Sequence, residues 1–247
     1  MKAQEKEIDL AGWRVAILAG GLSTRLRPAT NKTPKALLSV AGKPFLVHQL
    51  RLLRSNGFRR IVLCVGYLGE MIKAELGDGS NLGLQIAYSF DGPTLLGTGG
   101  AVKRALPMLG ECFLVIYGDS YMPVDYSAIV EAFVLSGKPA LMTVLENEGR
   151  WDVSNVSFEA GKIVRYDKKL RTPEMRHIDY GIAVLNASVF APFLNNVPFD
   201  LADVYSRLVL EEQMAAYKVK QRFYEIGSRQ GLAELDSLLR DKPANIL

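Results

Sequence analysis

The sequence of 247 residues contains only two histidines and two cysteines. A disulfide framework or a zinc site would need more sulfur ligands or a CxxC pair, so both are disfavoured. Cys64 and Cys112 lie in the apolar runs "IVLCVG" and "ECFLVIYG". We expect both to be buried thiols, the usual state of a free cysteine.

Long apolar runs and blocks of one charge are also missing. No run approaches the ~20 residues that span a bilayer, and "MKAQEKEIDLAGW" lacks the apolar core of a signal peptide. We therefore expect a cytoplasmic protein without a membrane partner. The net charge of +4 suits an anionic ligand, and without a basic block or RNA-binding signature we expect no nucleic acid partner.

Apolar periodicity predicts alternating strands and helices up to residue 146. The expected strands are 13–18, 60–66, 84–89, 112–120 and 139–146. A helix is expected from Pro44 to the C′ glycine Gly57, and others over 67–76, 98–109 and 125–136. Such alternation is typical of a parallel sheet covered by helices.

The second half of the chain has a different pattern. It predicts a hairpin over 153–169, a strand over 179–186, a helix over 200–216, extended chain over 217–227 and a helix over 228–240. Because no linker rich in Gly, Ser or Pro divides the chain, we predict one domain over 1–247. It is an α/β fold, a three-layer αβα sandwich with a Rossmann-like, mostly parallel mixed sheet. Within it we expect three parts, over 13–146, 147–227 and 228–247, of which the last is a closing helix.

The loop "LAGGLSTRLRPATNKTPKALLSV" follows the first predicted strand. Gly20 and Gly21 would let backbone N–H groups approach an anion, and Ser23 and Thr24 add hydroxyl donors. Arg25 and Lys35 add positive charge. In open α/β sheets such a loop, at the carboxyl end of a strand, is where ligands bind. The residues suit a triphosphate, although a solvated basic loop would have a similar composition. Neither GxxxxGK[ST] nor GxGxxG is present.

The segments "LAGGLSTRLRPAT", "TPKALLSV" and "AGKPF" resemble the signature of the sugar-1-phosphate nucleotidyltransferases. Ser23 replaces the usual second glycine of that signature, either with modest backbone strain or with a phosphate contact. The resemblance implies the nucleotide-diphospho-sugar transferase fold and transfer of a nucleotidyl group from an NTP to a sugar 1-phosphate.

Further segments extend the resemblance over nearly the whole chain. "LLGTGGAVKRAL" resembles the segment beside the base, with Leu95 in place of proline. "VIYGDS" and "FYEIGS" resemble the two metal-binding segments and imply that Asp119 and Glu225 hold Mg²⁺, with glutamate replacing the usual aspartate. The implied nucleotide-binding residues are Leu18, Ala19, Gly20, Gly21, Ser23, Thr24, Gly97 and Thr98.

The resemblance makes 13–146 the nucleotide-binding core and 147–227 the sugar-phosphate-binding part. "VRYDKK" matches its segment only loosely and implies that Asp167 and Lys168 bind the sugar phosphate. "DYGIAVL" implies that Tyr180 and Gly181 lie beside the sugar.

The implied reaction needs no general base, since the attacking phosphate oxygen is already an anion. It needs the negative charges of the two phosphate reactants to be neutralised and the reactants to be held in line. The resemblance implies that Arg25 binds the leaving pyrophosphate, Lys35 the α-phosphate and Asp119 the metal. We expect His48 and His177 to be structural.

Two other functions stay open. A phosphocholine-type cytidylyltransferase would need an aromatic and acidic box for its ammonium group, which Trp151 and Asp152 could supply. A catalytically weak regulatory module would be expected to lose Arg25, Lys35 or Asp119. The base, the sugar and the oligomeric state, including a homo-oligomer, are left open.

Overall fold

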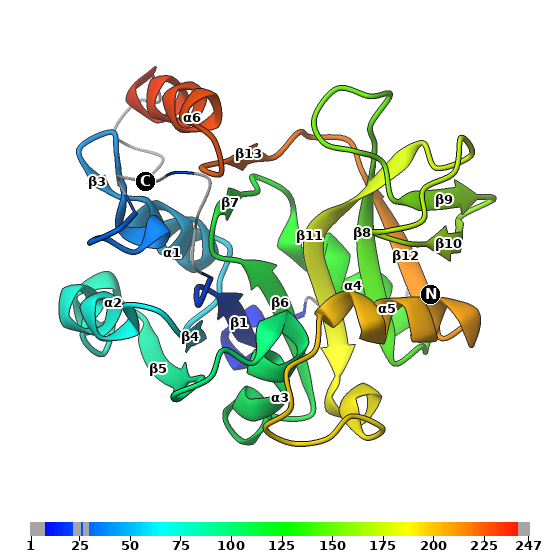
Figure 1. Ribbon diagram of the computed structural model, residues 1–247, viewed down its shortest axis with the longest axis horizontal. Coiled ribbons are helices and arrows are strands. Elements are labelled where there is room, and N and C mark those ends of the chain that lie inside the picture. The colour runs from blue at the N-terminus through cyan, green and yellow to red at the C-terminus, as the bar shows by residue number, and fades with distance from the viewer. Residues whose placement is uncertain (1–7, 22–25, 27–29, 242–247) are drawn as a thin grey trace, which may run out of the picture.

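The computed structural model describes residues 8–21, 26 and 30–241 (Figure 1). The α-helices are α1 (Phe45–Ser55), α2 (Gly69–Leu76), α3 (Gly97–Leu109), α4 (Tyr126–Ser136), α5 (Leu201–Leu210) and α6 (Arg229–Asp241). The strands of the first half are β1 (Arg14–Leu18), β2 (Ser39–Val40), β3 (Lys43–Pro44), β4 (Arg60–Val65), β5 (Gln85–Phe90), β6 (Cys112–Tyr117) and β7 (Ser120–Tyr121). Those of the second half are β8 (Ala140–Glu146), β9 (Val156–Glu159), β10 (Lys162–Tyr166), β11 (His177–Asn186), β12 (Met214–Val219) and β13 (Tyr224–Glu225).

A nine-stranded mixed sheet forms the centre of the molecule. Its order is β10-β9-β11-β6-β1-β4-β5, with β8 paired to β11 and β12 paired to β8. Strands β6, β1, β4 and β5 are parallel, whereas β11 is antiparallel to β6. The predicted α/β class with a mostly parallel mixed sheet is confirmed. In Figure 1 the hairpin β9–β10 lies at the opposite end of the molecule from α2.

Helices cover both faces of the sheet because side chains alternate along each strand. Val15 and Ile17 of β1 belong to a core with residues of α1, α2 and α4. Ala16 between them belongs to a second core with residues of α3 and α5. This arrangement confirms the predicted three layers.

The predicted helix over 200–216 is wrong in its last part. The helix α5 ends at Leu210, and a turn through Glu212, whose φ is +53°, redirects the chain. Residues Met214–Val219 then pair in parallel with β8 as β12. Tertiary pairing with a buried strand overrides the helical propensity of this segment.

A third, smaller core holds the last helix in place. Leu235 and Leu239 of α6 are buried against Val40 and Phe45, and α6 lies close to α1 and β3 in Figure 1. Both halves of the chain contribute to one sheet, because β8, β11 and β12 extend the sheet that contains β1. The predicted division of the domain between residues 146 and 147 stays a prediction. Within the described ranges, no helix combines the length and apolar character needed to cross a membrane.

Strand order also locates a crevice. From β1 the chain proceeds outward to β4 and β5, then returns to place β6 on the other side of β1. The carboxyl ends of β1 and β6 therefore flank the point at which the winding direction reverses. Ligands of open α/β sheets bind at such a point.

Candidate functional site

A cavity of about 360 Å³ opens at the carboxyl ends of the parallel strands. Apart from Glu225, all predicted nucleotide-binding, catalytic and metal-binding residues that the structure describes line this cavity. The lining residues are Leu18, Ala19, Gly20, Gly21, Leu26, Lys35, Ala36, Cys64, Asp91, Leu95, Gly97, Thr98, Ala101, Tyr117, Gly118, Asp119 and Gly227. Ser23, Thr24 and Arg25 lie outside the described residues, so their predicted roles stay predictions.

Close packing of backbone explains two glycines at this edge. A Cβ on Gly20 would lie 2.9 Å from the backbone nitrogen of Gly66, and one on Gly118 would lie 2.8 Å from the carbonyl oxygen of Leu18. Neither side chain fits without moving the main chain. The strand ends therefore form a floor of bare backbone, which suits close approach of a polyphosphate.

Lys35 and Asp119 meet in this cavity. The Lys35 ammonium donates to Asp119 Oδ2 over 2.7 Å, and their side chains are 13% and 36% exposed. Lys35 begins a short 3₁₀ turn after the glycine loop, and Asp119 lies in the turn between β6 and β7. Residues 84 positions apart thus place opposite charges at one end of the cavity.

The turn that carries Asp119 is held from both sides. Gln49 of α1, which is buried, donates from Nε2 to the carbonyl oxygens of Tyr117 and Ser120 over 2.8 and 2.7 Å. The N–H of Ile226 donates to the carbonyl oxygen of Asp119 over 2.9 Å. Gln49 was not predicted, because nothing in its local sequence distinguishes it from any other polar residue of a helix.

Glu225 lies beside this pair. It pairs with Ser120 across β13 and β7, and a Cβ on Gly227 would lie 3.0 Å from Glu225 Oε2 and 3.3 Å from Lys35 Nζ. The two carboxylates that the sequence assigns to Mg²⁺ therefore approach one ammonium group.

This donor set fits Mg²⁺. In proteins Mg²⁺ is usually held by one or two carboxylates together with substrate phosphates and water. No cluster of three or more His, Cys, Asp or Glu side chains suited to a metal occurs within 8–21, 26 and 30–241. A cation between Asp119 and Glu225 would therefore complete its shell with phosphate oxygens and water.

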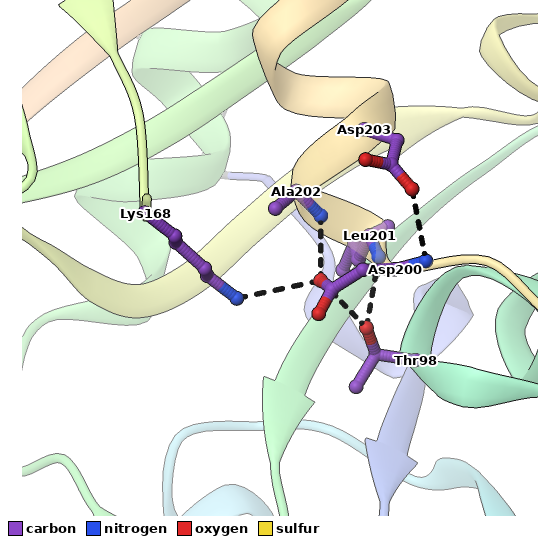
Figure 2. Close-up of polar contacts among 6 residues, drawn as sticks. All are labelled: Thr98, Lys168, Asp200, Leu201, Ala202 and Asp203. Atoms are coloured by element: carbon purple, nitrogen blue, oxygen red, sulfur yellow. Dashed lines mark hydrogen bonds and ion pairs between the residues drawn. The ribbon is translucent and has the colours of Figure 1, made fainter. Parts of the chain in front are cut away.

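Lys168, a predicted ligand of the sugar phosphate, reaches a network at the cavity edge (Figure 2). Its ammonium lies 3.4 Å from Asp200 Oδ1, and Thr98 Oγ1 donates to that same oxygen over 3.0 Å. Thr98 in turn accepts the N–H of Leu201 over 2.8 Å. Asp200 is the N-cap of α5 in a capping box with Asp203.

The charge of Asp200 is stabilised in this network. Burial raises the pKa of its carboxyl, but the N–H of Ala202 and the charge of Lys168 outweigh burial and hold that pKa below its usual value. Lys168 also lies 5.9 Å from the centre of the Tyr117 ring, and both Tyr117 and Thr98 line the cavity. Lys168 thus stands at the cavity rim, where an acceptor phosphate could approach.

The other predicted acceptor residues lie outside the cavity wall. Asp167 accepts the N–H groups of Lys169 and Leu170 over 2.8 Å each and so closes a local turn. Tyr180 is 2% exposed and packs edge-on against Phe223. Their predicted contacts with the acceptor stay predictions.

Gly181 marks an irregularity in β11. Its φ is +100°, and the register between β11 and β8 shifts between Asp179 and Ala183. Asp179 accepts the N–H of Gly181 over 3.0 Å, and burial raises the pKa of its carboxyl. Bulges of this kind often redirect side chains next to active sites.

Two carboxylates near the cavity were not predicted from the sequence. Asp91 directly follows β5 and lines the cavity, so the rule that ligands bind at strand carboxyl ends could have indicated it. Asp200 carried only the signal of a helix cap. Its contact with Lys168, 32 positions away, depends on tertiary structure.

Trp151 already has a cationic partner. The Arg222 guanidinium lies 3.9 Å from the centre of its ring and 4.3 Å from that of Tyr224. Trp151 is 41% exposed and does not line the cavity. The aromatic surface considered for a choline group therefore binds an arginine of the same chain.

Known proteins share both the sequence pattern and the fold. An N-acetylmuramate alpha-1-phosphate uridylyltransferase of Neisseria meningitidis serogroup B is 45% identical over 116 residues, 47% of this chain and 50% of the relative. A mannose-1-phosphate guanylyltransferase catalytic subunit beta of Drosophila melanogaster is 29% identical over 221 residues, 87% of this chain and 60% of the relative. This chain thus spans only about half to three fifths of these relatives' lengths.

The structure of the inositol-1-phosphate CTP transferase from T. maritima superposes with a TM-score of 0.75 at 23% identity, covering 96% of this chain and 100% of that one. This similarity shows a common fold. The model of the nucleotidyl transferase family matches residues 14–241. The match covers β1, both carboxylates near Lys35 and all of α6. The chain therefore belongs to the nucleotidyl transferase family.

Proposed function

We propose that this protein transfers a nucleoside monophosphate from an NTP to a sugar 1-phosphate and releases pyrophosphate. The observation that carries the proposal is the contact of Lys35 with Asp119 over 2.7 Å in a cavity floored by bare backbone. The relatives named above act, by their names, on sugar 1-phosphates or an inositol 1-phosphate, and family membership supports the same class of reaction here.

The described residues suit a displacement between two anions. The attacking phosphate oxygen needs no base, and none of the described cavity residues is a histidine. Lys35 would bind the α-phosphate, where negative charge increases in the transition state. Lys168 would bind the acceptor phosphate from the rim, with its ammonium oriented by Asp200.

Asp119 and Glu225 would hold Mg²⁺. When bound, the ion neutralises phosphate charge and makes the α-phosphorus a better electrophile. Lys35 contacts Asp119 over 2.7 Å. The ammonium that would bind the α-phosphate therefore lies beside the carboxylate that would hold the ion.

The alternatives are supported less well. A choline acceptor would have to displace Arg222 from Trp151. A regulatory module would not need Lys35 and Asp119 in contact. The cytoplasmic location and a homo-oligomeric state stay predictions.

Pyrophosphate release tests the proposal. The full chain is mixed with each common NTP, Mg²⁺ and a panel of sugar 1-phosphates, with phosphocholine as a separate acceptor. We expect release that requires both an NTP and a sugar 1-phosphate and that stops when EDTA removes the metal. Release with phosphocholine alone, or none with any pair, would contradict the proposed function.

A further inference from the structure

The three charged groups of the proposed reaction come from two separate parts of the chain. Lys35 begins the 3₁₀ turn that leads through β2 and β3 into α1. Asp119 directly precedes β7, and Glu225 ends β13, which pairs with β7. The reaction needs these groups at fixed distances from one another. The ribbon of β7 and β13 must therefore be held in a fixed position relative to α1.

Apolar packing joins the two parts but does not orient them. Phe45 at the start of α1 and Val40 of β2 share the third core with Tyr121 of β7 and with Ile226. Packing of this kind is non-directional, so it stabilises the contact without setting the direction of a side chain. Hydrogen bonds depend on distance and angle, and they can supply that precision.

A buried side chain of α1 makes such directional contacts. Gln49 is 1% exposed, and its Nε2 donates to the carbonyl oxygens of Tyr117 and Ser120 over 2.8 and 2.7 Å. These two carbonyls lie on either side of Gly118 and Asp119, so one amide group spans the turn that carries the carboxylate. Because carbonyl oxygens only accept hydrogen bonds, the amide nitrogen must face both of them.

Backbone groups hold the rest of this turn. The N–H of Gly118 donates to the carbonyl oxygen of Leu18, and the N–H of Ile226 donates to the carbonyl oxygen of Asp119, each over 2.9 Å. The first contact fixes the turn to β1, and the second fixes it to the end of β13. Neither contact reaches α1, and Gln49 extends the bracing to that helix.

The 3₁₀ turn that carries Lys35 is also bound to α1. The N–H of Phe45, the first residue of α1, donates over 2.9 Å to the carbonyl oxygen of Leu38, which ends that turn. A movement of α1 relative to the Asp119 turn would therefore change the distance between the Lys35 ammonium and the Asp119 carboxylate, which is 2.7 Å.

The oxygen of the Gln49 amide shows which property of this side chain is used. Gln49 Oε1 is buried and has no hydrogen-bond partner within the part of the chain that the structure describes. A buried acceptor without a partner is costly. An apolar side chain would avoid this cost but would leave two backbone carbonyls without their donor. The position therefore uses the two N–H donors of the amide.

We propose that Gln49 is a positioning residue, which holds the Asp119 turn at the distance from Lys35 that the reaction requires. This inference rests on the proposed function, because it gives Gln49 a part in that reaction. Gln49 does not line the cavity, so it acts through Asp119 and not by touching a substrate.

The first test measures the turn itself, in the protein without metal or nucleotide. Gln49→Met keeps the length of the side chain and removes both N–H donors. We expect the N–H groups of Gly118 and Ile226 to exchange with deuterium at least about tenfold faster than in the wild-type protein, because the turn opens locally. The N–H of Gly69, which donates to the carbonyl oxygen of Gly66 over 3.0 Å, should exchange as before.

The second test measures the reaction. With Mg²⁺, an NTP and a sugar 1-phosphate, Gln49→Met should lower kcat at least about tenfold and change the KM of the NTP by less than about threefold, since positioning acts on the transition state. Thermal melting shows the folded fraction.

The matched control is His48→Phe, a change at the neighbouring residue of α1. His48 is 2% exposed and contacts the carbonyl oxygen of Val40 over 2.7 Å, instead of the Asp119 turn. Loss of this hydrogen bond should lower thermal stability. We expect kcat of the folded control to stay within about twofold of the wild-type value.

Gln49→Glu provides a second variant of nearly the same shape. Its protonated carboxyl has one O–H to donate, whereas the carboxylate has no donor. We expect the ratio of its kcat to the wild-type kcat to fall as the pH rises from about 6 to about 9, because the carboxylate would face two carbonyl oxygens. This pH dependence would not follow from a loss of packing.

The outcomes separate the two proposals. Unchanged or uniformly faster exchange, or kcat of a folded Gln49→Met variant within about twofold of wild type, would overturn the positioning role and leave the proposed function standing. An equal loss of kcat in His48→Phe would do the same. If Gln49→Met does not fold, a ratio independent of pH in Gln49→Glu would overturn the positioning role. Absence of pyrophosphate release from the wild-type protein with every pair of substrates would overturn both proposals.

Discussion

At the scale of single residues, the site is dominated by charge placed in a confined space. The Lys35 side chain is 13% exposed, and its ammonium contacts Asp119. Charges screened so little by water interact more strongly than exposed ones. A phosphate bound beside the Lys35 ammonium, where Asp119 lies, would be attracted in the same way.

Lys35→Ala should lower turnover by about a hundredfold or more, the usual effect of losing one charge-stabilising donor. Pyrophosphate release gives turnover, and thermal melting checks that the variant is folded. Lys32→Ala is the control, because Lys32 is an exposed lysine three positions earlier in the chain. Near-normal turnover of a folded Lys35→Ala variant would show that Lys35 has no catalytic role.

Gly227→Ala tests the space between Glu225 and Lys35. The new methyl group would lie 3.0 Å from Glu225 Oε2 and 3.3 Å from Lys35 Nζ, so we expect the two charged groups to be pushed apart and turnover to fall by about tenfold or more. Gly12→Ala is the control, since a Cβ there meets nothing within 4 Å. Equal turnover in both variants would show that the space between Glu225 and Lys35 has no role in catalysis.

At the scale of elements, the N-cap of α5 joins three parts of the chain. Asp200 caps α5, accepts from Thr98 of α3 and pairs with Lys168, which follows β10 (Figure 2). The cap satisfies helix N–H groups that would otherwise lack partners. The ion pair is between half-exposed side chains, for which stabilisation is about 0–1 kcal/mol.

Asp200→Ala should therefore lower the free energy of unfolding by about 1 kcal/mol, and Asp200→Ser should restore most of that loss. Lys168→Ala should change the free energy of unfolding by less than about 0.5 kcal/mol. Denaturant titration measures all three variants, with Asp125→Ala at the cap of α4 as a reference for loss of a cap. If Lys168→Ala destabilises the protein as much as Asp200→Ala, Lys168 is a structural residue and is not held ready for an acceptor.

At the scale of the whole molecule, the sheet explains which parts of the site could be predicted from the sequence. Strand positions were readable because buried strands are apolar runs that end in glycine or aspartate. This pattern placed Gly20, Gly21 and Asp119 at one edge. The meeting of Lys35 with Asp119 followed from the family resemblance, and the structure brings them into contact.

Contacts that cross the molecule could not be read in this way. The parallel pairing of β12 with β8 turned a segment with helical propensity into a strand. Gln49 and Asp200 act through partners far along the chain. The residues next to them in the sequence do not indicate those partners.

The central claim is that the cavity at the carboxyl ends of β6, β1, β4 and β5 binds a nucleoside triphosphate. A crystal structure of the protein with Mg²⁺ and a non-hydrolysable NTP analogue tests it directly. We expect the phosphates within hydrogen-bond distance of Lys35 and of the Gly20–Gly21 backbone, with the rest of the nucleotide inside the same cavity. A nucleotide bound elsewhere, such as the cavity lined by Arg14, Arg60 and Ser80, would contradict it.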